Sequence, residues 1–452
     1  MDHIPNEILS HIFSHLLTDR EKQRLHQDRI DCILPVRLQS KKTVVDGFRS
    51  WKKLLRTESI NAVVRRVAIE TTPWDPELGE GGDLEWWPDS WIDHGVWHEF
   101  DFAIILICNI PNLNSLTVRF STLCAGEEND GLEPEPTHVR ERTLRIIERA
   151  LRMRETLRKT SIRELVLFGF EDTPLPKDLT QNLLRNIERL HISFTYGDHQ
   201  REKPEFPPYL ANTLLPSVSE HLVELTLAGY FWGSITVEFN GKGLSFPCLK
   251  SLTLEEYIIL RQDQYDWVLE QRSLIDLKLY DCKIATHFLV GRLENWGVNL
   301  NGWEKLTENF TDVDGSYHSS ISSTSPSGPL QLGWYTSDLR WSSMFDRIHE
   351  NLPMLQNFTF GSASWQNYFE HLPKDTNKDV LPSERYQTFY HGYWSDDWYK
   401  PVNKRSPWVE AGYFENDTVP GTPLGLYLRT ELPDRRALEK LMEVTRKRRD
   451  GK

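Results

Sequence analysis

The fold of this chain is decided by a stretch that reads Leu274-Ile-Asp-Leu-Lys-Leu-Tyr-Asp-Cys-Lys-Ile284. It begins with the template Leu-x-x-Leu-x-Leu, whose last two leucines alternate with polar residues as a half-buried β-strand requires. Apolar residues occupy the same three positions in eight copies along the chain. The copies are Val64/Val67/Ile69, Leu113/Leu116/Val118, Ile162/Leu165/Leu167, Ile187/Leu190/Ile192, Leu222/Leu225/Leu227, Leu249/Leu252/Leu254, Leu274/Leu277/Leu279 and Leu355/Phe358/Phe360. This recurrence predicts a repeat architecture.

Most copies of the template follow a segment whose apolar residues have helical spacing. These segments are His98–Ile107, Val139–Leu157, Leu179–Leu184, Tyr265–Leu269 and Trp341–Leu352. One strand–helix unit cannot bury its own apolar face, but neighbouring units that stack in parallel share one core. The alternation is typical of leucine-rich repeats. We therefore predict an α/β fold in which residues 61–365 form an irregular right-handed solenoid, with parallel strands on the concave side and helices on the convex side.

The intervals between copies are uneven, which indicates insertions. They are Trp74–Glu99, Cys124–Thr137, Asp198–Pro208, Ile235–Phe246 and Thr311–Pro329. The last of these is rich in serine and is predicted to be disordered. Beyond Phe360 the template stops. We interpret the aromatic-rich residues 366–452 as a C-terminal cap that ends in a helix over Asp434–Arg449, with Asp434 as its N-cap.

Composition narrows the class of protein. Hydrophobic residues make up 39% of the chain, which is enough for a sizeable core. The net charge of −13 argues against a general binder of nucleic acid or anionic membranes. No apolar run reaches the roughly 18–20 residues of a membrane span, and no signal pattern opens the chain. The five cysteines lack C-x-x-C spacing, which favours a reducing compartment, cytoplasmic or nuclear.

A second informative stretch lies at the N-terminus, over Ile4–Leu16. Its apolar residues fall on one helical face, and Pro5 suits a first helical position. The stretch resembles the opening helix of the F-box, with its Leu-Pro-x-Glu-Ile start. Downstream, Val36-Arg-Leu-Gln-Ser-Lys41 is similar to the Leu-Arg-Leu-Val-Ser-Lys of many fungal F-boxes. The residues from Phe48 to Leu55 then continue a helical apolar stripe.

The match is weaker in its second half. The bridge Thr18–Asp31 is longer than in most F-boxes, and Lys42 and Thr43 replace the usual aromatic residue.

The resemblance implies that residues 1–55 form an all-α F-box of about three helices. In that family the F-box binds the Skp adaptor, which bridges to cullin and RING subunits, while the C-terminal domain holds a protein substrate for ubiquitination. The chain would then be a non-catalytic subunit that needs no cofactor. By position, the resemblance assigns adaptor contacts to Ile4, Pro5, Glu7, Ile8, Leu9, Ile12, Phe13, Leu16, Val36 and Leu38.

Two other classes of protein compete with this interpretation. The first is a leucine-rich-repeat scaffold or inhibitor whose N-terminal helices only cap the array. The second is an enzyme, which would need a polar cluster on the concave face. The sequence contains no G-x-S-x-G elbow, phosphate loop or dinucleotide fingerprint. His94 and His98 have helical spacing for a metal but no third ligand, so no metal site is predicted. The repeat resemblance assigns Cys282 a structural bond to backbone.

Two surface features are candidates for partner binding. Tryptophans crowd one insertion and the C-terminal region, and aromatic residues on loops are favoured contacts in protein recognition. The candidate substrate contacts are Trp86, Trp87, Trp91, Trp394 and Trp398. The alternative is that these rings pack the loops and the ends of the array. The second feature is an arginine-rich helix over Val139–Leu157, interpreted either as a solvated convex face or as a docking site for an acidic or phosphorylated partner.

Overall fold

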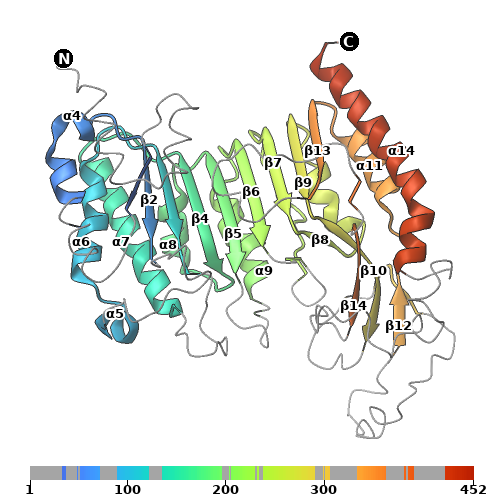
Figure 1. Ribbon diagram of the computed structural model, residues 1–452, viewed down its shortest axis with the longest axis horizontal. Helices are drawn as coiled ribbons and strands as arrows, with labels where there is room; N and C mark the ends of the chain where they lie inside the picture. The colour runs from blue at the N-terminus through green and yellow to red at the C-terminus, as the bar shows by residue number, and fades with distance from the viewer. Residues whose placement is uncertain are drawn as a thin grey trace, which may run out of the picture. The chain divides into compact units, whose positions relative to one another are not determined.

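The structure is a computed structural model of the 452-residue chain (Figure 1). It describes residues 33–36, 48, 51–71, 89–121, 135–195, 203, 205–229, 232–233, 238–290, 299, 301–305, 333–362, 381–382, 385–390 and 423–451. These residues form an α/β fold in which helices accompany a parallel sheet. No helix within these ranges is both long and apolar enough to cross a membrane.

The eight template copies coincide with eight strands of the main sheet, which confirms the predicted strand positions. The strands are β2 (Arg66–Glu70), β3 (Ser115–Arg119), β4 (Glu164–Glu171), β5 (Arg189–Thr195), β6 (Glu224–Gly229), β7 (Ser251–Glu255), β9 (Asp276–Tyr280) and β13 (Asn357–Gly361). The sheet order is β1-β2-β3-β4-β5-β6-β7-β9-β13. The pairings β1–β2, β2–β3, β3–β4, β4–β5, β7–β9 and β9–β13 are all parallel.

Equivalent template positions face one another across neighbouring strands. Val67 aligns with Leu116, Leu116 with Leu165, and Leu165 with Leu190. The same row runs through β7, β9 and β13 as Leu252, Leu277 and Phe358. All of these side chains are buried. Fully burying one leucine or valine is worth about 1.5–3 kcal/mol, so a shared register gives each strand a continuous apolar row to pack on.

The chain forms two compact units, which are described separately. The first comprises Met1–Arg201 and Thr213–Glu224, and the second Glu202–Asn212 and Leu225–Lys452. The helical segments before β6 are residues 51–56, α4 (Glu58–Asn61), α5 (Asp89–His94), α6 (His98–Ile105), η2 (Leu106–Asn109), α7 (Thr137–Thr156), α8 (Lys177–Leu184), α9 (Phe206–Tyr209), η3 (Leu210–Leu214) and η4 (Leu215–Ser217). The predicted helices before β3, β4 and β5 correspond to α6, α7 and α8.

The N-terminal residues of the first unit depart from an all-α F-box. Ile33–Val36 forms strand β1, which lies parallel to β2 with Val36 opposite Ile69. β-branched residues favour this extended state, and a proline is tolerated in an edge strand. The apolar stripe that follows packs into the unit. The Phe48 ring meets Trp97 edge-on at 5.6 Å, and Trp51 Nε1 donates to Ala103 O over 3.1 Å. These residues are therefore part of the first unit, through the sheet and the packing against α6.

The second unit carries α9 and the start of η3, together with helices η5 (Asp263–Tyr265), α10 (Asp266–Leu269), α11 (Trp341–Asn351) and α14 (Pro423–Arg449). It also contains a second, mixed sheet that sequence patterns did not predict. Its strands are β8 (Ile258–Ile259), β10 (Lys283–Val290), β11 (Glu304–Lys305), β12 (Gly333–Thr336) and β14 (Tyr386–Tyr390), in the order β11-β12-β10-β14 with β8 also paired to β10. The predicted disordered stretch Thr311–Pro329 lies outside the described residues.

The C-terminal helix is longer than predicted. α14 starts at Pro423 and runs through Pro433, so Asp434 lies in its interior and is not its N-cap. Asp434 instead accepts a hydrogen bond from the backbone N–H of Ser342 at the start of α11, over 2.9 Å. Figure 1 shows α11 and α14 lying against each other. The prediction that Asp434 caps its own helix is therefore wrong. Its carboxylate instead caps α11, which is distant in the sequence.

Candidate functional site

The structure does not describe most of the residues that were assigned to the adaptor contact. Ile4, Pro5, Glu7, Ile8, Leu9, Ile12, Phe13, Leu16 and Leu38 lie outside the described residues. Val36 is described as the last residue of β1. Its backbone is paired to β2, which places this residue at an edge of the main sheet.

Of the candidate tryptophans, only Trp91 belongs to the described part of the chain. Trp86, Trp87, Trp394 and Trp398 lie outside it. Trp91 stands in α5 and is 1% exposed. Its ring meets Trp97 at 5.7 Å and Phe100 at 5.0 Å, both edge-on. Trp91 therefore follows the alternative interpretation, in which the ring serves packing, because it fills the core beneath α5 and α6.

The topology of the first unit singles out one edge of the sheet. Three insertions begin where β2, β3 and β5 end, and residues 72–88, 122–134 and 196–202 of these insertions lie outside the described residues. Because these strands are parallel, their carboxyl ends meet at the same edge. Binding residues are often carried on loops that a rigid scaffold positions. We therefore take the carboxyl edge of β2–β5 as the candidate binding edge.

A buried polar cluster lies at the base of this edge, where β3 and β4 end. Arg140 donates from Nη1 to Gly169 O over 2.8 Å and from Nη2 to Ser121 O over 2.7 Å. Its Nε lies 3.4 Å from Glu135 Oε2, and the same carboxylate oxygen accepts the Ser121 N–H over 2.8 Å. Ser121 and Glu135 flank residues 122–134, so this cluster ties together the two ends of that insertion.

The electrostatics of the cluster are those of a sealed interior. Glu135 is fully buried, and this burial raises its pKa more strongly than the Arg140 charge and the Ser121 N–H lower it. Gly169 has a φ of +65°, and a Cβ there would approach Phe120 O to 3.0 Å. Only glycine lets the strand pass this close. A carboxylate without access to solvent cannot meet a substrate, so we assign the cluster to supporting the edge.

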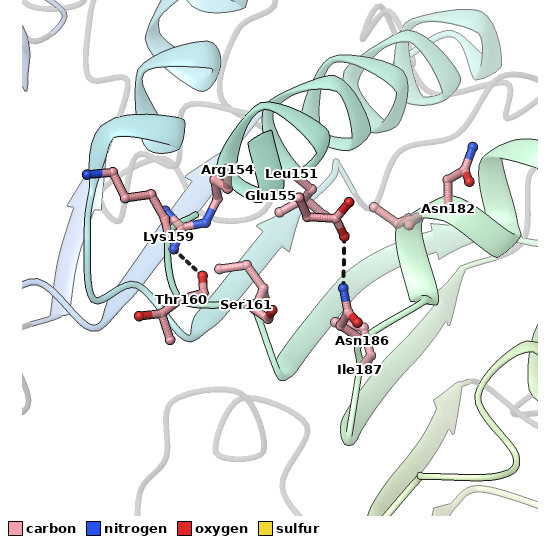
Figure 2. A pocket seen from close by; sticks show the side chains of 11 residues that line it. Leu151, Arg154, Glu155, Lys159, Thr160, Ser161, Asn182, Asn186 and Ile187 are labelled. Carbon is pink, nitrogen blue, oxygen red and sulfur yellow. Dashed lines mark hydrogen bonds between the residues drawn. The ribbon is translucent and has the colours of Figure 1, made fainter. Parts of the chain in front are cut away.

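Figure 2 shows a small pocket between the end of α7 and α8. Arg154 forms part of its wall and donates to the carbonyl oxygens of Ile107, Ile110, Leu113 and Thr160 over 2.6–2.9 Å. Burial lowers the pKa of Arg154 to about 10, so the group stays charged at neutral pH. Asn186 Nδ2 donates to Glu155 Oε1 over 3.0 Å. The free space suits about one water molecule, so the pocket is too small for a substrate or cofactor.

Two arginines of the arginine-rich helix contradict the prediction of a solvated face. Arg140 and Arg154 are buried and hold backbone carbonyls. Three others form ion pairs, namely Arg142 with Asp101, Arg145 with Glu141 and Arg152 with Glu148. The sequence contained a signal for the buried pair. Positions 140 and 154 continue the same helical stripe as Leu144, Ile147 and Leu151, which points toward the core.

Cys282 behaves as predicted. Its Sγ donates to Leu254 O over 3.4 Å, and burial raises the pKa of its thiol. A buried thiol of this kind is a poor nucleophile. His94 and His98 are exposed. Across the described ranges, no group of three or more His, Cys, Asp or Glu side chains is arranged to hold a metal ion.

Comparison with known proteins adds no relative. No protein-family model matches the chain, and no curated protein matches it.

Proposed function

We propose that this chain is the substrate-recognition subunit of a Skp–cullin–F-box ubiquitin ligase, and that its main sheet is a right-handed solenoid of leucine-rich-repeat type. The observation that carries the proposal is a pairing of two features in one chain. An F-box-like helical stripe at Ile4–Leu16 precedes eight template strands. Where register is known, template leucines align across neighbouring strands.

A recurring backbone conformation supports the repeat character of the sheet. Gly169, Glu256 and Asp281 each stand two residues after the last leucine of a template copy. All three have left-handed backbone, with φ of +65°, +55° and +49°. Such a conformation is costly for a non-glycine residue. Glu256 and Asp281 directly follow β7 and β9, whereas Gly169 lies at an irregularity within β4. The same backbone conformation therefore recurs at one template position in three of the copies.

The division of labour follows from where rigid and variable parts lie. Ile4–Leu16 offers an apolar helical face to the Skp adaptor, while the repeats form a rigid support. The insertions at the carboxyl edge of β2, β3 and β5 contact the protein substrate. The Arg140–Glu135 cluster fixes the base of one insertion, which limits the entropy lost on binding. In this scheme the chain itself catalyses no reaction, because the conjugating enzyme supplies the chemistry.

The test is a pair of point variants in the full chain. Ile8→Asp places a charge in the apolar stripe, whereas Ser10→Asp adds the same charge outside it. We expect purified Skp adaptor to bind the wild type and Ser10→Asp, and to lose binding to Ile8→Asp. Circular dichroism should show the same fold in all three. Adaptor binding that survives Ile8→Asp, or a wild type that never binds, contradicts the proposal.

A second candidate function is a repeat scaffold whose N-terminal segments cap the array. One observation favours it, because β1 and the helical residues around Trp51 pack into the first unit. Deletion of residues 1–55 removes this packing and would unfold the unit under either hypothesis. Deletion of residues 1–28 discriminates between them. If the chain is a ligase subunit, the deletion leaves the melting temperature unchanged and abolishes adaptor binding. If it is a scaffold capped by Ile4–Leu16, the deletion lowers the melting temperature, and the full chain already fails to bind the adaptor.

A further inference from the structure

The outer side of α7 in the first unit carries an unusual mixture of side chains. Positions 142, 146, 149, 153 and 157 recur every three or four residues and so share one helical stripe. Met153 is 36% exposed and Leu157 47% exposed, while Ile146 is partly exposed. Arg149 is exposed and forms no ion pair within the described structure. The stripe is therefore both apolar and basic.

The neighbouring helices extend this stripe into a broader face. The ion pair between Arg142 and Asp101, over 2.9 Å, places α6 beside α7, as Figure 1 shows. On α6, the Phe102 ring is 49% exposed. Lys52 Nζ lies 5.0 Å from the centre of that ring, and residues 51–56 are held against α6 by Trp51. Lys53 and Arg56 of the same segment are exposed and unpaired within the described ranges.

We propose that this surface, the α6–α7 face, binds an acidic amphipathic helix of a partner protein. The face is defined by Lys52, Phe102, Arg149, Met153 and Leu157. Its exposed apolar side chains, Phe102 on α6 and Met153 and Leu157 along the α7 stripe, call for an apolar stripe on the partner helix. Its unpaired cations call for carboxylates beside that stripe. Fifteen residues separate Arg142 from Leu157, so the face is about 22 Å long and matches a partner helix of about four turns.

Charge complementarity indicates that the partner helix is acidic and not basic. Of the acidic groups around the stripe, Asp101, Glu141 and Glu148 are paired with arginines of α7, whereas the exposed Glu58 and Glu99 form no ion pair within the described ranges. They are outnumbered by the exposed cations Lys52, Lys53, Arg56 and Arg149, which also have no ion pair there. A basic partner would meet these charges unfavourably. This inference does not rest on the ligase proposal, because it uses no residue assigned to the adaptor or the substrate edge.

The experiment uses the full chain and two labelled peptides of about 18 residues. Both carry leucines at helical i, i+3, i+4 and i+7 spacing, one with glutamates at the remaining positions and the other with lysines. Fluorescence anisotropy measures the affinity of each. We expect the glutamate peptide to bind at least about tenfold more tightly than the lysine peptide. Added salt should weaken this binding, because the cations of the face are exposed.

Variants locate the binding surface. Phe102→Asp and Arg149→Glu should each lower the affinity for the glutamate peptide by about tenfold or more. The matched controls are Leu432→Asp, at an apolar position that is 55% exposed on α14, and Lys177→Glu on α8. Both controls should leave the affinity unchanged. All four positions are exposed, so thermal melts should show retained folding.

Three results would overturn the proposal. The glutamate peptide fails to bind, the two peptides bind equally, or the controls weaken binding as much as the face variants do. Analytical ultracentrifugation tests the alternative that the face binds a second copy of this chain. A wild-type dimer that Phe102→Asp converts to a monomer would assign the face to a second copy of this chain, and the acidic partner would be rejected.

Discussion

Asp434 and Arg385 form a buried ion pair in the second unit, with Arg385 Nε donating to Asp434 Oδ2 over 2.8 Å. The same carboxylate accepts the Tyr386 hydroxyl over 2.8 Å and, through Oδ1, the Ser342 N–H over 2.9 Å. One side chain of α14 thereby neutralises a buried guanidinium beside β14 and caps α11. Removing either partner leaves the other charge buried without compensation.

We expect Asp434→Ala to lower the free energy of unfolding by about 3–5 kcal/mol, because it strands the Arg385 charge and uncaps α11. Urea denaturation of the full chain measures this loss. Asp346→Ala is the matched control, since Asp346 pairs with exposed Lys440 between the same two helices. It should cost about 1 kcal/mol or less. Equal losses in the two variants would contradict the assigned role of Asp434.

Arg158 offers a stabilising substitution. It follows α7 with a φ of +52°, and its N–H donates to Glu155 O over 2.9 Å while Lys159 N–H donates to Arg154 O over 3.0 Å. This is a Schellman turn, in which glycine is the favoured residue. Arg158→Gly should therefore raise the free energy of unfolding by about 0.5–1 kcal/mol.

Chemical denaturation compares this variant with Arg149→Gly, which places glycine inside the same helix. That control should lose about 1 kcal/mol. A loss of stability in Arg158→Gly would show that its side chain matters more than its backbone conformation.

Glu135 should give the fold a measurable pH dependence. Burial raises the pKa of Glu135 above its ordinary value of 4.5, so the folded chain binds this proton more tightly than the unfolded chain does. The corresponding stability is present below the ordinary pKa and is lost as the pH rises through the raised pKa. Glu135→Gln removes this titration. We expect its stability relative to wild type to increase from pH 4.5 upward.

Urea denaturation across that pH range provides the measurement. If the wild type instead gains stability over Glu135→Gln as the pH rises, then the Arg140 charge dominates the Glu135 environment and burial does not.

The cysteines should differ in reactivity. Burial raises the pKa of the Cys108 and Cys282 thiols, whereas Cys248 is exposed. Thiolate is the reactive form, so low thiolate content and burial both slow alkylation. Iodoacetamide treatment of the native chain, followed by peptide mass mapping, should modify Cys248 and leave the other two intact until denaturant is added. Native alkylation of Cys282 would contradict its bond to Leu254 O.

The candidate binding edge could be located from sequence, but its support could not. Uneven spacing between template copies shows where insertions enter, and parallel strands place the insertions after β2, β3 and β5 at one edge. Nothing local indicates that Glu135 meets Arg140 and Ser121 beneath them. The helical position of Arg140 on an apolar stripe was the available signal. Charge alone had suggested a solvated face.

The positions of the eight template strands were determined by the sequence alone, because each strand alternates apolar and polar residues over a few neighbouring positions. Tertiary structure decided which buried charges are tolerated and where irregular strands pair. Arg154 lies inside the first unit because four carbonyls from other turns surround it. β10 pairs with β14 about a hundred residues later. Most of this compensation comes from groups that are distant in sequence and meet only in the folded chain.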